Sequence, residues 1–278
     1  MTLMAESGLE QLEQEFAAAR VEPNEPGFYE DRAFIRREQQ VPHYLDNYAR
    51  FVQWRHYDMG YAEHAEPVIH VVAEEVQLAL KADGSEQAHA EAPLVISRIL
   101  EREGIWNYVA CGALTINFPP TSSFEPFSFW SINMQYGKPF DSSYRWVVAP
   151  PFQIIDVSIQ ACRYPYPFNH LLPKIVWATE TETTVGTPVD IFSPDALKEI
   201  DRSGMSMEEA LDTYLPNYHK RFAPDFPAHI VTSLDTRLKY VPTSVMISEE
   251  SLEQLKGFQT RGLSAAQLYT KNIRPRLS

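Results

Sequence analysis

The sequence predicts an α+β fold, in which N-terminal helices precede an antiparallel β-sheet core and a C-terminal third of mixed helix and strand. Two observations support this prediction. Apolar residues recur at helical spacing within residues 7–103, whereas from residue 105 they form short aromatic or β-branched runs between prolines. Helices followed by strands favour α+β over a doubly wound parallel sheet. We expect one domain over residues 1–278, with residues 1–30 forming a helical arm and loop.

The first predicted helix covers residues 7–20, where Leu9, Leu12, Phe16 and Ala19 fall on one face. A loop rich in proline, glycine and asparagine follows over residues 21–31. The aromatic-rich residues 43–58 are also expected to be helical. An amphipathic first helix of this kind suits contact with a protein partner or a second copy of the chain, and core packing explains it equally well.

Residues 67–81 fit either a helix or a strand, and Pro67 would suit a first helical turn. The polar run 81–92 predicts a loop. Residues 93–103 predict a helix that ends at Gly104, because glycine readily adopts the left-handed conformation of a helix cap.

Short runs with strand character then follow at residues 105–118, 127–136, 144–149, 152–161 and 174–184. Proline-rich turns separate these runs, which is the pattern of an antiparallel meander.

The last third predicts helices at 193–202 and 206–219, with Ser193 and Ser206 as N-caps. Residues 228–234 and 240–247 have strand character, and Ser248 is expected to open a last helix.

Composition restricts the classes of partner. The chain is 44% hydrophobic, which is enough for a sizeable core, and its net charge is −13. So acidic a chain, without any basic cluster, disfavours nucleic acid and anionic membrane as partners. Two cysteines form no disulfide framework, and neither a signal peptide nor a run of 18 apolar residues is present. We therefore expect a reduced, cytoplasmic protein with no membrane or nucleic-acid partner.

The residues best suited to catalysis lie between Gly104 and Pro165. Cysteine is a strong nucleophile once a histidine generates its thiolate and an acid orients the histidine. Cys111 is followed by the strand-like Tyr144-Arg145-Trp146 and then by Asp156 in the run IIDVS.

Over residues 94–161 this order resembles the transglutaminase-like and papain-like thiol hydrolases, whose pattern is Cys, then His-x-Trp, then Asp. The resemblance implies Cys111 as nucleophile and Asp156 as orienting acid. The implied activity is that of a cysteine-dependent hydrolase or acyltransferase acting on an amide or thioester-like bond.

The chain departs from that pattern at the histidine. Tyr144, or Arg145 in a shifted register, occupies its place, and neither is a general base near neutral pH. Either a distant histidine completes the site, or the chain is an inactive relative that binds a ligand or protein. In the second case, Tyr144, Arg145, Trp146 and Trp130 are the candidate binding residues. Arg145 is suited to bidentate binding of a carboxylate or phosphate, and a small molecule or peptide is the expected partner.

Three further interpretations stay open. His56, His64 and His70, with acidic residues between them, could hold a metal or small molecule, but no HExxH or HxH spacing is present, so we assign no metal ligand and no cofactor. Cysteines are among the most frequently buried residues, so Cys111 could simply fill the core. Cys162, beside Arg163, could be a reactive thiol or a strand-end residue without a role.

Overall fold

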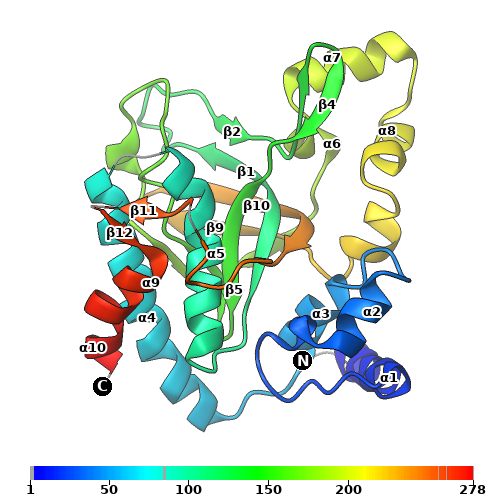
Figure 1. Ribbon diagram of the computed structural model, residues 1–278. Helices are drawn as coiled ribbons and strands as arrows, with labels where there is room; N and C mark the ends of the chain where they lie inside the picture. Colours follow the sequence, from blue (N-terminus) through cyan, green and yellow to red (C-terminus); the bar gives the residue numbers. More distant parts are fainter. Residues whose placement is uncertain (1–2, 84–85, 256, 261, 278) are drawn as a thin grey trace.

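The computed structural model describes residues 3–83, 86–255, 257–260 and 262–277. Within them, N-terminal helices precede an eight-stranded antiparallel sheet, which confirms the predicted α+β class (Figure 1). The strand order is β7-β6-β5-β1-β10-β9-β8, and β2 pairs with β1 beside this path. The strands are β1 (Tyr108–Asn117), β2 (Phe127–Phe129), β5 (Tyr144–Ala149), β6 (Phe152–Asp156), β7 (Val176–Ala178), β8 (Glu182–Thr184), β9 (Ala228–Ser233) and β10 (Thr236–Met246).

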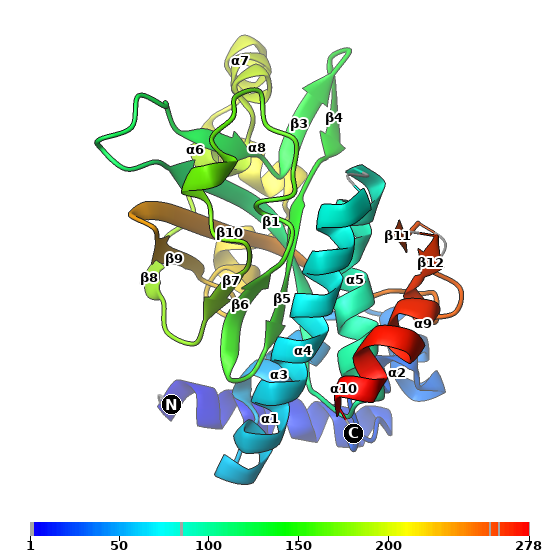
Figure 2. The same ribbon diagram turned by 90° about the vertical axis from the view of Figure 1, so that its left-hand side faces the viewer.

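The sheet curls until its two ends meet (Figure 2). Strands β7 and β8 stand at opposite ends of the order, yet only residues 179–181 separate them along the chain. The Thr181 hydroxyl donates to Gln153 Oε1 on β6 at 2.5 Å, and its oxygen lies 2.7 Å from His229 Nδ1 on β9. Opposite ends of the sheet are therefore joined through one side chain.

One face of the sheet is covered by the helical pair α4 (Met59–Asp83) and α5 (Glu86–Arg102) (Figures 1 and 2). Helix residues such as Ile69 and Ile99 share an apolar cluster with Val109 of β1 and Val147 of β5. Helices α9 (Ala265–Leu268) and α10 (Arg274–Leu277), the π-helical turn η4 (Tyr269–Ile273) and the hairpin β11 (Gln259–Thr260)–β12 (Leu263–Ser264) pack on the outer side of α4.

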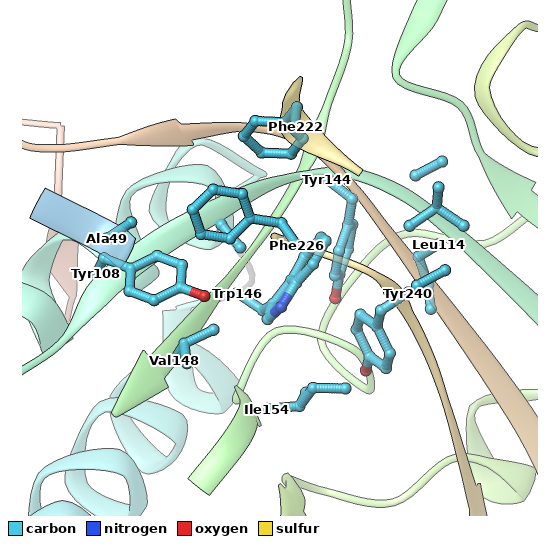
Figure 3. Packing of buried hydrophobic residues seen from close by; sticks show 14 of the residues in the cluster. Ala49, Tyr108, Leu114, Tyr144, Trp146, Val148, Ile154, Phe222, Phe226 and Tyr240 are labelled. Atoms are coloured by element: carbon cyan, nitrogen blue, oxygen red, sulfur yellow. The ribbon is translucent and has the colours of Figure 1, made fainter. Parts of the chain in front are cut away.

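The opposite face of the sheet turns into the curl and is aromatic. Trp146 on β5 and Tyr240 on β10 lie with ring centroids 5.2 Å apart. Figure 3 shows Trp146 between Tyr108, Phe226 and Tyr240. The aromatic runs of the sequence thus serve mainly as core.

The predicted N-terminal helix is present as α1 (Leu3–Ala19), and Leu9, Leu12 and Phe16 are buried as expected. The Phe16 ring contacts Phe28, Phe34, Tyr44 and Phe51. These rings belong to η1 (Phe28–Glu30), α2 (Arg32–Glu38), α3 (Asp46–Trp54) and the segment before α3. The apolar face of α1 is therefore covered by the chain's own residues.

The remaining elements lie around β10 and at the end of the sheet where β5 begins (Figure 1). They are the hairpin β3 (Ile132–Gln135)–β4 (Lys138–Asp141), η2 (Asn169–Leu171), α6 (Pro188–Ile191), α7 (Pro194–Ser203), α8 (Met207–Tyr214) and η3 (Tyr218–Phe222). The Ser193 and Ser206 caps form as predicted, each accepting from a backbone N–H.

Three predictions about the helices are wrong. Helix α4 begins at Met59, so Pro67 lies inside it, because Ala65, Val68 and Ile69 on either side are all buried against the core. Helix α5 begins at Glu86, so the predicted loop 81–92 is mostly helical; residues 84 and 85 of it lie outside the described residues. Ser248 opens no helix, since Leu252 and Leu255 are buried in an irregular segment.

The predicted strand 127–136 is two strands. The chain leaves the main sheet after Phe129, and β3 pairs with β4 as a separate hairpin. Within the part of the chain described, no helix is both long and apolar enough to cross a membrane.

Candidate functional site

Cys111 and Asp156 lie on opposite faces of the sheet. Side chains alternate along a strand, and Cys111 faces helices α4 and α5 together with Val109 and Val147. Asp156 faces the interior of the curl, where Tyr144 and Tyr240 contact it. The structure therefore does not bring the predicted nucleophile and orienting acid together.

Asp156 is fully buried and hydrogen-bonded on both oxygens. Oδ2 accepts from the Tyr144 and Tyr240 hydroxyls at 2.9 Å each, while Oδ1 accepts from the backbone N–H of Ser158 at 2.8 Å and of Ile159 at 3.1 Å. Burial raises the pKa of Asp156 to about 6, although these four donors favour the anion. The carboxylate thus holds strand β6, the following turn and two tyrosines together.

Neither thiol has the surroundings that produce a thiolate. Burial raises the pKa of Cys111 to about 12, and the nearby Arg145 guanidinium offsets only part of this. The pKa of Cys162 is likewise raised to about 12 by burial and by the charge of Asp156. No histidine among the described residues hydrogen-bonds to either sulfur.

A cavity of about 400 Å³ opens where strand β5 begins, and we call it the β5 cavity. It brings together the predicted binding residues Tyr144 and Arg145 with residues from three other segments. Its lining is Ala90, Phe129, Asp141, Ser142, Ser143, Tyr144, Arg145, Ser158, Cys162 and Arg163.

Arg145 points away from its two strand neighbours, as alternation predicts. It is paired across the sheet with Cys111, and its Nη1 donates to the Ala90 carbonyl of α5 at 3.1 Å. No acidic side chain in the described part of the chain forms an ion pair with this half-buried guanidinium. The β5 cavity thus contains a cation that has no ion-pair partner among the described residues.

A β-bulge supports the cavity from behind. The β1–β10 register shifts between Cys111 and Gly112, so that Thr243 is an extra residue on β10. A Cβ on Gly112 would lie 2.0 Å from the Val241 carbonyl oxygen, so only glycine allows this approach. The bulge places Thr243 Oγ1 2.8 Å from Ser131 Oγ, which lies 2.7 Å from Ser143 Oγ on the cavity wall.

The two predicted tryptophans lie elsewhere. Trp146 is buried inside the curl and does not line the β5 cavity. Trp130 is half-buried after β2, and its contribution is a backbone carbonyl that accepts from Ser142 Oγ at 2.7 Å. Only Tyr144 and Arg145 of the four predicted binding residues line the cavity.

The histidine group does not form a site. His56 and His64 are exposed, and His70 packs against the rings of Trp177 and Phe152 at centroid distances of 4.4 and 5.4 Å. Among the residues the structure describes, no three His, Cys, Asp or Glu side chains lie close enough to hold a metal ion.

The sequence reasoning missed the hydroxyls of Ser142 and Ser143 and gave Cys162 and Arg163 little weight. A signal was present, because Ser-Ser directly precedes the strand that carries Arg145. What the sequence lacked was the turn after Asp156, which brings Cys162 and Arg163 back to the start of β5.

Comparison of the chain with protein families, with curated proteins and with solved structures finds no match. The chemistry of the site therefore has to be inferred from its geometry.

Proposed function

We propose that this chain is a non-catalytic binding protein whose β5 cavity takes a small molecule, or the end of a peptide, bearing a carboxylate or phosphate. The observation that carries the proposal is Arg145, a half-buried cation that lines the cavity without an ion-pair partner among the described residues. A guanidinium at the wall of a cavity, only partly in contact with water and without an ion-pair partner among the described residues, is suited to pair with an anionic ligand.

The rest of the lining fits such a ligand. Arg163 also lines the cavity, and Ser143 supplies a hydroxyl that can contact a ligand oxygen, whereas the Ser142 hydroxyl already donates to the Trp130 carbonyl. Asp141 is the one carboxylate in the described lining, and its Oδ1 accepts from the Ser143 N–H at 2.8 Å. Arg145 therefore places a positive charge at the wall of this cavity on a chain that is acidic overall.

A thiol hydrolase or acyltransferase has less support from the geometry. Cys111 is buried beneath α4 and α5, Asp156 faces the other side of the sheet, and the raised pKa of both cysteines keeps them protonated near neutral pH. Tyr144, at the histidine position of the thiol-hydrolase pattern, donates to Asp156 instead of contacting Cys111.

Isothermal titration calorimetry with inorganic phosphate, acetate and succinate tests the proposal. We expect at least one of these anions to bind, and Arg145→Gln to weaken its affinity about 10- to 100-fold, because hydrogen bonds to charged groups are the strong ones. Arg145→Lys keeps the charge but loses the planar fork, so its affinity should fall between the two.

The matched control is Arg237→Gln, which removes an exposed strand arginine that pairs with Glu182 on β8. It should leave binding unchanged. Failure of all three anions to bind, or equal weakening by both substitutions, would overturn the proposal. Thermal unfolding adds a second readout. Arg145→Gln should cost about 1 kcal/mol or less, because it removes the hydrogen bond to the Ala90 carbonyl and no ion pair among the described residues; a larger loss of stability would mean that Arg145 is mainly structural.

A further inference from the structure

A second cavity, of about 450 Å³, lies between helix α3 and the interior face of the curled sheet, and we call it the mouth cavity. It shares no lining residue with the β5 cavity. Strand β5 contributes its start, Tyr144 and Arg145, to the β5 cavity and its later part, Trp146 and Val148, to the mouth cavity. The volume lies in the range of small-molecule sites, which often occupy the mouths of curled or closed sheets.

The walls of the mouth cavity are flat and aromatic. Figure 3 shows three of them, Tyr108, Trp146 and Phe226, beside Val148. Trp54 at the end of α3 and Tyr57 line the side next to the helix. Ring faces of this kind stack against planar, polarisable molecules.

Polar groups without protein partners line the same space. Tyr108 and Trp146 are only 4% and 2% exposed, yet neither the Tyr108 hydroxyl nor the Trp146 indole N–H forms a hydrogen bond among the described residues. Gln53 also lines the cavity, and its buried Oε1 has no partner there either. Buried tyrosine and tryptophan usually find a partner for their polar atom, so these groups suit a ligand.

His229 adds an acceptor of defined orientation. Thr181 gives its one hydroxyl proton to Gln153, so His229 Nδ1 must donate to Thr181 Oγ1. Burial lowers the pKa of His229, which favours the neutral ring, and Nε2 then carries a lone pair. His229 is the cross-strand partner of Tyr240, so its ring lies on the interior face of the sheet.

The cavity offers no uncommitted charge. The described lining contains no lysine or arginine, and its one carboxylate, Asp225, pairs with Arg50 Nε at 2.7 Å. A charged ligand would lose its water there without gaining a counter-ion, whereas a neutral ligand would not.

From these observations we infer that the mouth cavity binds an uncharged, planar heteroaromatic molecule with hydrogen-bond donors and acceptors along its edge. Stacking on the aromatic walls supplies affinity. Specificity comes from hydrogen bonds to the edge of the ligand. The groups that can form them are the Tyr108 hydroxyl, the Trp146 N–H, the Gln53 amide and His229 Nε2. The site is independent of the anion proposed for the β5 cavity, since the two cavities have no residue in common.

Ligand-observed NMR and calorimetry on the full chain test the inference with a probe panel. Hypoxanthine, adenine and 2-pyridone are uncharged heteroaromatics with edge donors and acceptors. Toluene is planar without them. Benzoate is a planar anion, and it is tested on Arg145→Gln so that binding in the β5 cavity does not contribute. We expect binding within the first group and weaker or no binding of toluene and benzoate.

Two variants locate the binding. Thr183→Trp puts a bulky ring at an exposed position of the cavity rim, outside the core, and should abolish binding. Tyr108→Phe keeps the ring but removes the hydroxyl, and should weaken binding about three- to tenfold. Tyr214→Phe, at a half-buried tyrosine outside this lining, is the matched control and should change nothing.

Circular dichroism and thermal unfolding establish that each variant is folded before binding is measured. The inference is overturned if no heteroaromatic of the panel binds the wild-type chain, if toluene or benzoate binds more tightly, or if folded Thr183→Trp binds as well as wild type. The β5 cavity is tested with anions and Arg145 variants, and the mouth cavity with neutral heteroaromatics and other variants. Failure of one proposal can therefore be told apart from failure of the other.

Discussion

The buried carboxyl of Asp156 should make the stability of this protein depend on pH in a way that one substitution removes. Its pKa in the folded chain is about 6, against an ordinary value of 3.8. Asp156→Asn replaces the carboxyl by a neutral group of the same shape. Its Oδ1 can still accept from the Ser158 and Ile159 N–H groups, and its amide can donate to the Tyr144 and Tyr240 oxygens once these hydroxyls turn.

The direction of the effect follows from proton binding. Between about pH 4 and 6 the folded chain holds a proton on Asp156 that the unfolded chain has released, so stability falls as pH rises through this range. The stabilising contribution is complete below the unfolded value and is lost above the folded one. With about 1.4 kcal/mol for each pKa unit, the loss amounts to about 3 kcal/mol.

Urea unfolding of wild type and Asp156→Asn at a series of pH values from 3.5 to 8 measures this directly. Subtracting one protein from the other cancels every other titrating group. Relative to wild type, the variant should gain about 3 kcal/mol as pH rises across the window. A difference that stays flat, or that changes in the opposite direction, would refute the account of Asp156. Tyr240→Phe removes a donor to the carboxylate and should extend the decline to higher pH.

Three further results are expected. Gly112→Ala should destabilise the fold by about 1–3 kcal/mol or more in urea unfolding because its Cβ would meet the backbone of β10, whereas the control Gly60→Ala, near the start of α4 and 3.5 Å from its nearest contact, should be neutral or stabilising. Native Cys111 and Cys162 should react with iodoacetamide more slowly than free cysteine at pH 7.5, with full reactivity returning in denaturant; fast alkylation of the native protein would contradict their raised pKa. Ser193→Ala should cost about 1 kcal/mol by thermal unfolding, because its Oγ accepts from the N–H of the third residue of α7, and an unchanged midpoint would mean that this cap contributes nothing.

The fold class was predictable because it follows from the order of helices and strands, which local sequence patterns indicate. Helical spacing identified α1, and strand runs bounded by prolines located β5 and the start of β6. The start of α4 was predicted wrongly because proline is usual in the first turn of a helix. That local rule takes no account of the burial of Val68 and Ile69, which lie inside the helix. The polar run before residue 93 was predicted to be a loop for a similarly local reason, but part of it lies in α5.

The site was predictable only in part. Alternation correctly separated Arg145 from Tyr144 and Trp146, because period two is a local property. The pairing of Cys111 with Asp156 depended on which face each strand presents and on the bulge at Gly112, and neither can be read from strand order. Cys162 lines the β5 cavity because the chain turns back after Asp156. His229 lines the mouth cavity because it lies on β9, a strand from the last quarter of the chain.

The position of β1 has a consequence for how the chain is made. This strand pairs with β5, which follows it closely, and with β10, which begins at Thr236. During synthesis the ribosome must therefore add more than a hundred residues between the appearance of β1 and that of β10, its last partner. Through that interval the nascent chain presents one side of an apolar strand with open backbone groups, which is a template for association with other chains. Fragments that end before β10 should therefore be prone to aggregation. A chaperone that binds β1 would be of most use while the last third of the chain is still being translated.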